Sequence, residues 1–430
     1  MATTPLPTTA KSPAPPPRSV LRDTSFLRLW AGTTASGLAT WALPFVLGLA
    51  VLHRDLGAAG LGLVLAARTV GFLAAVAVGG VLADRHSRRA AVLWSALAAA
   101  AAAPLLAAGL GRSVVLMTAA AALAGAGQGA CRPAFQALVA ETVDPGRRQQ
   151  ANAAMTMAVR GCTLAGPALT ALLAAFLDVR TLLLGIALLW LVAALVPGKG
   201  KGKGKGKGNA AAPDPADGPP APRAGFRAEF LEGIREARRH PWFLAGLSAL
   251  AAVIALGYSA TSVALPLISR DRYGTEWVLA AAVTAYTVGA LAGALVMARL
   301  RPRSQGWAAF AGLAAYGFAP LSLMLPVHPL VVVAAYAVAG IGIELFNVPW
   351  FTATQREVDP GKLARVSSLD FLVSYGLAPV GLALIAPAVE AFGVTAVLAV
   401  CAAACFLVPA AAALVPTARH FARTAPAARD

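Results

Sequence analysis

Charged residues are scarce in this sequence. Asp, Glu, Lys and Arg make up 13% of the 430 residues, whereas a soluble domain usually contains about 25%. Hydrophobic residues make up 58%, so a soluble fold would expose more apolar surface than its polar residues could cover. A lipid bilayer solvates such surface. The composition therefore excludes an ordinary soluble protein and indicates an integral membrane protein.

Motifs of enzymes and metal sites are also missing. Cys131, Cys162, Cys401 and Cys405 lie inside apolar runs and lack the close, paired spacing of a disulfide framework or metal cluster. No Gly-rich loop ends in Gly-Lys followed by Ser or Thr, which argues against an ATP-driven pump, and no nucleophile elbow is present. We therefore predict that the protein is not an enzyme and holds no metal or cofactor.

Apolar runs of the length that crosses a bilayer, about 20 residues, occur twelve times. The first six are predicted at 27–52, 58–82, 90–110, 114–139, 154–176 and 181–197, and the last six at 243–268, 278–298, 306–325, 329–352, 367–388 and 393–415. The first 20 residues have no apolar core and are not expected to form a signal peptide. The sequence thus predicts an all-α membrane protein with twelve transmembrane helices.

Lys and Arg are distributed unevenly between the two sets of loops. Of the 36 in the chain, one set of loops holds only Arg54, Arg112, Arg180, Arg270 and Arg272. Most of the others fall in the second set, which includes both termini. Because cytoplasmic loops carry the excess of Lys and Arg, both termini are predicted to be cytoplasmic. These charges suit an anionic inner leaflet and need no nucleic acid to explain them.

The polar segments divide the chain into five regions. We predict a disordered cytoplasmic N-terminus (1–22), a six-helix bundle (23–197), a cytoplasmic linker (198–241), a second six-helix bundle (242–415) and a cytoplasmic tail (416–430). Gly198–Gly208 alternates Gly and Lys and is interpreted as a disordered tether or, alternatively, a grip on anionic lipid. Phe226–Arg239 is predicted to be an amphipathic helix on the inner membrane face.

The two halves carry one recognisable repeat. Pro133, Phe135 and the run Val143–Gly146 (Val-Asp-Pro-Gly) recur about 215 residues later as Pro349, Phe351 and Val358–Gly361. Each copy ends one helix and begins the next, since Asp-Pro-Gly is a turn signal. Six helices, a linker and six helices follow the parallel-repeat plan of major facilitator transporters. We therefore predict two pseudo-symmetric six-helix bundles.

The loop after the second span carries the strongest motif. It reads Gly80-Val-Leu-Ala-Asp84-Arg85-His-Ser-Arg88-Arg89 and closely resembles the signature loop of the major facilitator superfamily. The departure is Ser87, where many members have Gly. With the span count and the repeat, the resemblance covers about residues 20–415 and is strongest to the bacterial exporter branch of the enterobactin exporter and macrolide efflux proteins. It implies a bacterial cytoplasmic membrane and a functional monomer.

The resemblance implies a gating role for this loop. Asp84 would meet the N-terminus of the eleventh span near Ser367 and Ser368, where a carboxylate is favoured, and Arg88 could pair with Glu141 or Asp144. Gly80 would let a neighbouring helix approach closely. Both charged contacts would exist only while the cytoplasmic side is closed. The alternative is simple anchoring of the arginines at the membrane surface. In the second half Met297 stands where Asp84 would be, so the latch is predicted to be one-sided.

A second motif is weaker. Gly166 and Pro167 in the fifth span partly match the Gly-Pro motif of the family's exporters, but Thr170 and Ala171 replace the paired glycines that usually follow. An ordinary proline kink explains the same residues nearly as well.

Ionisable residues inside spans are costly and often functional. The residues singled out as a polar cluster or as titrating groups are Arg68, Gln128, Arg132, Arg160, Glu344, Asn347 and Asp370. Glu344 is predicted either to load and release a proton or to pair structurally with Arg132 or Arg160. For Arg68 and Arg160 the alternative is a bond to a carbonyl or a snorkelled end, and for Arg160 this alternative is favoured. Asp370 is either a second titrating group or a charge at a helix start. Four aromatic residues could line a substrate pocket or, as lone aromatics do more often, serve as packing residues or interface anchors: Trp41, Tyr258, Tyr286 and Tyr375.

The predicted function is export of a small, fairly apolar organic compound, such as an antibiotic or siderophore, driven by the proton gradient. The two bundles would rock around a site near the bilayer midplane. One rival is an importer on the same fold, and another is a non-transporting receptor or scaffold, which would not need charged residues such as Asp84 and Glu344.

Overall fold

Twelve spans arranged as two bundles confirm the predicted fold class. The computed structural model describes residues 19–85, 87–197, 225–275, 277–300 and 302–422. Within these residues eleven helices are long and apolar enough to cross a membrane, and the shorter apolar helix Val179–Leu195 makes the twelfth. The predictions for residues 1–18, for Gly198–Gly208 and for the end of the tail lie outside the described residues.

The N-terminal bundle consists of six single helices. They are α1 (Thr24–Leu52), α2 (Ala58–Arg85), α3 (Arg88–Gly109), α4 (Val114–Thr142), α5 (Arg148–Ala174) and α6 (Val179–Leu195). Side-chain caps explain several of the breaks, since Ser87, Ser113 and Asp178 accept hydrogen bonds from the first turns of α3, α4 and α6. Short 3-10 turns, η1 (Val20–Arg22) and η2 (Pro145–Arg147), precede α1 and α5.

The C-terminal bundle follows the helix α7 (Phe226–Arg238). Its seventh span is α8 (Pro241–Ala252), a π-helical stretch η3 (Val253–Tyr258) and α9 (Ser259–Asp271), and its ninth is α11 (Gln305–Ala314), η4 (Ala315–Gly317) and α12 (Phe318–Met324). The remaining elements are α10 (Trp277–Arg299), α13 (Pro329–Glu357), α14 (Leu363–Phe392), α15 (Val394–Ala413) and η5 (Pro416–Arg419).

Glycines allow equivalent helices to pack closely in the two halves. In α2 and α4, a Cβ at Gly71 or Gly129 would collide with backbone atoms of the other helix, and in α10 and α13 the same holds for Gly289 and Gly340. Small residues permit such close helix contacts within a bilayer. The second and fourth spans and the eighth and tenth spans are thus paired in the same way, as the repeat predicts.

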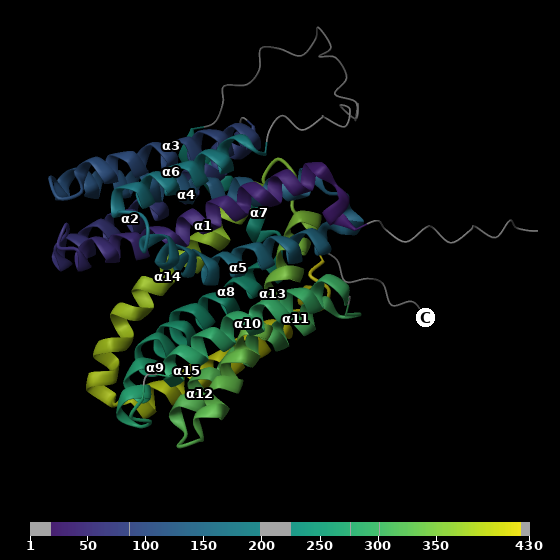
Figure 1. The fold of residues 1–430 in the computed structure, drawn as a ribbon. Helices are drawn as coiled ribbons and strands as arrows, with labels where there is room; N and C mark the ends of the chain where they lie inside the picture. The colour runs from purple at the N-terminus through teal and green to yellow at the C-terminus, as the bar shows by residue number, and fades with distance from the viewer. Residues whose placement is uncertain (1–18, 86, 198–224, 276, 301, 423–430) are drawn as a thin grey trace, which may run out of the picture.

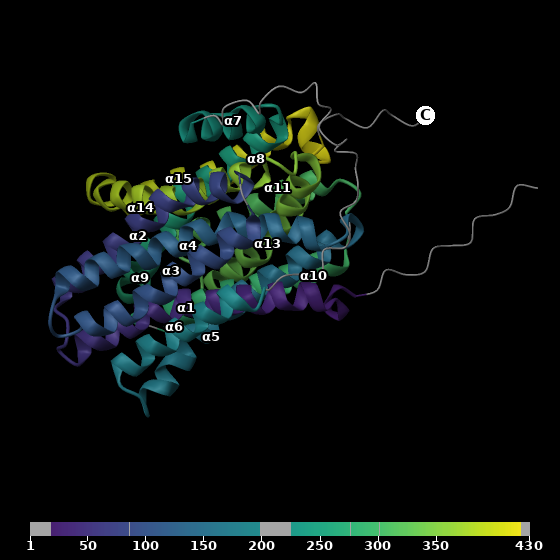
Figure 2. The same ribbon diagram turned by 90° about the horizontal axis from the view of Figure 1, so that it is seen from above.

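One end of the molecule holds both ends of the described chain, near Val20 and Phe421, and is called the terminal face. There Val20 donates its N–H to Gln150, Arg147 lies 3.5 Å from Asp23, and Arg356 donates to the carbonyl of Phe421. The two bundles converge toward this face, and their ribbons diverge toward the opposite face (Figure 1). Helix α7 lies at the edge of the molecule beside α8 (Figure 2).

Candidate functional site

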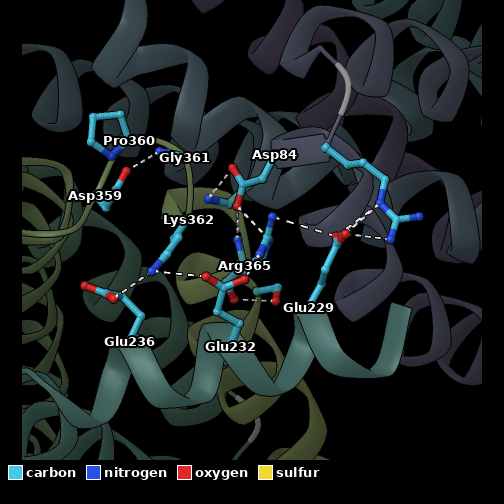
Figure 3. Close-up of polar contacts among 12 residues, drawn as sticks. Asp84, Glu229, Glu232, Glu236, Asp359, Pro360, Gly361, Lys362 and Arg365 are labelled. Atoms are coloured by element: carbon cyan, nitrogen blue, oxygen red, sulfur yellow. Dashed lines mark hydrogen bonds and ion pairs between the residues drawn. The ribbon is translucent and has the colours of Figure 1, made fainter. Parts of the chain in front are cut away.

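Asp84 binds the first turn of α14 from the end of α2. Its two carboxylate oxygens accept hydrogen bonds from the backbone N–H of Ala364 at 3.1 Å and of Arg365 at 2.9 Å. The carboxylate is fully buried and lies 3.7 Å from the Arg365 guanidinium. Free N–H groups and the helix dipole favour an anion at this position. The contact therefore joins the two bundles at the terminal face, one turn earlier in α14 than Ser367 (Figure 3).

Gly80 makes the close approach of α2 to α14 possible. A Cβ at this position would lie 2.7 Å from the carbonyl oxygen of Ala364 and 2.8 Å from the Cβ of Ser368. Gly80 and Asp84 lie one turn apart on the same face of α2. The glycine thus sets the distance at which the carboxylate of Asp84 reaches the N–H groups of α14.

Arg88 begins α3 and also reaches across the bundles. It lies 3.8 Å from Glu141 and 4.0 Å from Asp84, and it donates a hydrogen bond to the carbonyl of Pro360 in the loop before α14. Asp144, the other predicted partner of Arg88, pairs with Arg147 at 2.7 Å. Arg89, the next residue of α3, is half-buried.

Helix α7 presents an acidic face to both bundles, which the sequence interpretation missed. Glu229 accepts hydrogen bonds from Nε and Nη2 of Arg85 in the N-terminal bundle, the shortest 2.6 Å, and lies 3.8 Å from Arg365 of the C-terminal bundle. Glu232 lies 3.0 Å from Arg365 and 3.2 Å from Lys362, and Glu236 lies 3.2 Å from Lys362. Figure 3 shows the three glutamates of α7 facing Lys362 and Arg365.

The spacing of these three glutamates in the sequence could have predicted the acidic face of α7. Positions 229, 232 and 236 follow the i, i+3, i+7 pattern that places side chains on one face of a helix. The spacing of Phe226, Phe230 and Ile234, on which the amphipathic prediction depends, indicates only the apolar face of this helix.

The ion pairs of α7 shift the pKa values of their partners. The hydrogen bond from Lys362 is the main reason why the pKa of Glu232 lies below its ordinary value. Burial alone would raise the pKa of Glu236, but the hydrogen bond and charge of Lys362 hold it below the ordinary value. The same contacts, with Glu232 first, raise the pKa of Lys362. All three groups are therefore charged at neutral pH.

Between α5 and the helices α10 and α13, side-chain amides join the bundles at the terminal face, where Asp84 does so between α2 and α14. Gln149 at the start of α5 donates to the carbonyl oxygens of Met297 at 2.6 Å and Leu300 at 2.7 Å, where α10 ends. Asn152 and Gln355 exchange hydrogen bonds of 3.1 and 3.2 Å between α5 and α13. Met297 indeed provides no second copy of the Asp84 contact. Its backbone nevertheless takes part in a bond between the bundles that the sequence did not reveal.

An ion pair joins the bundles in the middle of the spans. Arg160 of α5 lies 2.7 Å from Glu344 of α13, whose side chain is fully buried, whereas the Arg160 side chain is 24% exposed. Asn347 lies 3.5 Å from both carboxylate oxygens, and the Arg160 guanidinium lies 5.8 Å from the ring centre of Tyr286. The simpler interpretation of Arg160, a carbonyl bond or a snorkelled end, is therefore wrong.

Arg68 and Gln128, both of the N-terminal bundle, form a separate pair. Arg68 donates to the Gln128 side chain at 2.8 Å and to the backbone carbonyl of Thr40 at 3.1 Å. That carbonyl would normally bond the N–H four residues later, but position 44 is Pro44, which has none. Pro44 in α1 thus leaves the Thr40 carbonyl free to accept from the Arg68 guanidinium. This bond agrees with the predicted alternative that Arg68 bonds a carbonyl.

Arg132 lies near an aromatic pair and not near Glu344. Its guanidinium carbon is 5.9 Å from the ring centre of Tyr375, which packs against Phe72 at 4.8 Å. Tyr375 belongs to α14 and is 38% exposed although its ring faces residues of α2 and α4. The rings of Tyr375 and Phe72 and the guanidinium of Arg132 thus meet where α14 faces the N-terminal bundle. The predicted polar residues consequently form two groups and not one.

Asp370 belongs to the core of the C-terminal bundle. It is 4% exposed and accepts a hydrogen bond of 3.1 Å from the indole of Trp350. Helix α14 begins at Leu363, two turns earlier, so the interpretation of Asp370 as a charge at a helix start is wrong. Gly166 packs against α1, where a Cβ would lie 2.9 Å from that of Trp41, and Pro167 lies inside α5.

Comparison with known proteins decides the family. The family model of the Major Facilitator Superfamily matches residues 29–381. The chain belongs to the major facilitator superfamily. It is similar to the crystal structure of the human organic anion transporter MFSD10 (TETRAN), with a TM-score of 0.68 and 16% identity over 93% of this chain and 100% of that one.

A second solved structure shares the fold. It is a bacterial homologue of the iron transporter ferroportin in an outward-facing state with soaked iron, with a TM-score of 0.67 and 15% identity over 90% of this chain and 98% of that one. At these identities the likeness shows the fold alone. No curated protein sequence matches the chain. The predicted kinship with the enterobactin and macrolide exporters therefore stays a prediction.

Proposed function

We propose that this major facilitator protein is a proton-coupled exporter of a small, fairly apolar organic compound, such as an antibiotic or siderophore. It would work in the bacterial cytoplasmic membrane with the terminal face toward the cytoplasm. In this orientation the contacts of Asp84, α7 and Gln149 close the cytoplasmic side, and the described conformation is the outward-open one.

The ion pair between Arg160 and Glu344 is the observation that carries the proposal. It joins the two bundles where the central cavity of a rocking transporter lies. A carboxylate in this position is costly unless paired, so adding or removing one proton changes how strongly the bundles attract each other. A single titration is thereby linked to a movement of the whole molecule.

A cycle follows from this linkage. In the outward-open state a proton from outside neutralises Glu344, and the Glu344 carboxyl then holds Arg160 less strongly. The bundles rock, the contacts of Asp84 and α7 break, and the cavity opens to the cytoplasm. There the proton leaves, the substrate enters, and re-formation of the Arg160–Glu344 pair favours return to the outward-open state. One proton enters for each substrate that leaves.

The names of the structural neighbours support transport as a class. One is named as an organic anion transporter and the other as a homologue of an iron transporter. Both names describe movement of a solute across a membrane, which favours a transporter over a receptor or scaffold. The two cargoes differ, so the names do not choose a substrate for this chain.

Growth of a pump-deficient bacterium expressing the protein tests export. The panel should contain antibiotics, dyes and siderophores that are neutral, cationic or anionic. Asp84→Asn is the matched control, because it keeps the size of the side chain and removes the charge that binds α14. Raised tolerance that Asp84→Asn loses supports export. Unchanged tolerance to the whole panel, with the protein found in the membrane, contradicts it, and an uptake assay then tests the importer.

A further inference from the structure

Positive charge exceeds negative charge between the bundles at mid-membrane. The N-terminal bundle contributes Arg68, Arg132 and Arg160, and the C-terminal bundle contributes Glu344, which pairs with Arg160. Asp370 bonds with Trp350 inside its own bundle. Among the described residues, no carboxylate lies within the 4.0 Å ion-pair distance of Arg68 or Arg132. Two guanidinium groups thus lack an anionic partner.

The groups around these two arginines orient them without neutralising them. Arg68 is held by the Gln128 amide oxygen and by the Thr40 carbonyl that Pro44 leaves free. Arg132 lies one turn after Gln128 on α4, so both arginines belong to one patch. Its neighbour Tyr375 supplies only a ring face. Unpaired charge at this depth is costly and commonly marks a substrate pathway.

We propose that Arg132, together with Arg68, binds a negatively charged group of the transported compound. This inference rests on the proposed transport function and makes the substrate an amphipathic organic anion, for example an aryl carboxylate. A guanidinium group can bind both oxygens of a carboxylate in its plane. The exposed ring of Tyr375, which packs against the buried Phe72, provides an aromatic surface for the apolar body. The substrate remains largely apolar and carries one negative charge.

An anionic substrate also suits the proposed direction. The inside of a respiring bacterium is electrically negative, so the membrane potential itself drives an anion outward. Exchange of one proton inward for one monoanion outward moves two positive charges into the cell per cycle. Export should therefore speed up when the inside is made more negative at constant proton gradient.

Binding of three matched compounds to the purified full-length protein tests the charge preference. The compounds are 2-naphthoate, the neutral 2-naphthamide and the cationic 2-(aminomethyl)naphthalene, which share one aromatic body. We expect naphthoate to bind at least about tenfold more tightly than naphthamide, as a charge-assisted hydrogen bond allows. Arg132→Gln should remove this preference, and Arg132→Lys should keep part of it.

Arg112→Gln is the control, because Arg112 is exposed in the loop between α3 and α4 at the opposite face. Arg68→Gln serves as a second variant if Arg132→Gln lowers the melting temperature. Naphthoate that binds no better than naphthamide to the folded wild-type protein, including no binding of either, overturns the inference. A preference that Arg132→Gln and Arg68→Gln both retain overturns it as well.

The growth assay separates failure of this inference from failure of the proposed function. Asp84-dependent tolerance confined to neutral or cationic compounds, with no preference for naphthoate, supports export and overturns the anion site. A preference for naphthoate that depends on Arg132, without tolerance to any compound, supports the anion site and contradicts export.

Discussion

At the scale of single residues, Glu344 is the group on which proton coupling depends in the proposed cycle. Glu344→Gln keeps the size of the side chain and its hydrogen bonding with Arg160 and Asn347, but it cannot gain or lose a proton. We expect the variant to insert and fold, because the amide still fills the site. In proteoliposomes it should lose substrate movement driven by a pH gradient and keep exchange of substrate for substrate. Normal gradient-driven transport by this variant would restrict Glu344 to a structural role.

Gly80 offers a test of the gate that leaves every charge in place. In Gly80→Ala the new Cβ would lie 2.7 Å from a backbone oxygen of α14, so α2 and α14 must move apart. Overpacking of this kind typically costs about 1–3 kcal/mol, here against the closed terminal face. Transport should fall about tenfold or more. The matched control is Gly62→Ala on the same helix, where nothing lies within 4 Å. Equal transport by the two variants would argue against this contact as a gate.

The sequence identified single charged residues better than it identified their partners. Asp84 and Glu344 stand out because a carboxylate in or next to an apolar run is rare. Their partners depend on how the two bundles pack, and no local sequence pattern predicts that packing. For this reason the favoured prediction for Arg160, a carbonyl bond or a snorkelled end, is wrong, and the residue pairs with Glu344. Gln149 and Asn152 could not be predicted as contacts, because a neutral amide near a helix start has no distinctive signature.

At the scale of elements, the long helices were the easiest to predict. A bilayer requires about 20 apolar residues per span, so the apolar runs predicted all twelve spans to within several residues of their observed bounds. The π-helical stretch Val253–Tyr258 and the 3-10 turn in the ninth span were not predicted, because the apolar pattern continues through them. Helix α7 was predicted as a helix, but its acidic face and its contacts with both bundles were not.

Helix α7 should hold the terminal face closed over a defined pH range. The pKa values of Glu232 and Glu236 lie below the ordinary 4.5, and that of Lys362 lies above the ordinary 10.5. The ion pairs therefore contribute fully between these ordinary values. They are lost as the pH falls through the lowered carboxyl pKa values or rises through the raised lysine pKa. We expect the contribution of these α7 ion pairs to closure to be constant from about pH 6 to 8 and to decline below the ordinary carboxyl value.

Neutral substitutions of the same helix check this expectation at constant pH. Glu229→Gln, Glu232→Gln and Glu236→Gln together should shift the equilibrium several-fold toward an open terminal face, since each partly exposed pair contributes about 0.2–1 kcal/mol. The closed population is obtained from the distribution of distances between spin labels on the two bundles. Arg235→Gln is the control, because Arg235 lies on the exposed side of α7. An unchanged distance in the triple variant would mean that α7 does not hold the bundles together.

At the scale of the whole molecule, opening of one face should close the other. The hydrogen bonds and ion pairs between the described parts of the two bundles all lie between the terminal face and the level of Arg160 and Glu344. If each bundle moves as a rigid body about that level, breaking the contacts at the terminal face must bring the opposite ends together. Local fraying of α7 and the loops would leave the opposite face unchanged.

Two pairs of spin labels distinguish these movements. Arg22→Cys with Arg303→Cys reports on the terminal face, and Arg112→Cys with Asp271→Cys reports on the opposite face; the native cysteines are buried and should not take label. In the background of Asp84→Asn and Glu229→Gln, the first distance should lengthen and the second should shorten. Because Asp84 and Glu229 both contact Arg365, their effects should not be additive. A longer first distance with an unchanged second distance would reject rigid-body rocking in favour of local opening at the terminal face.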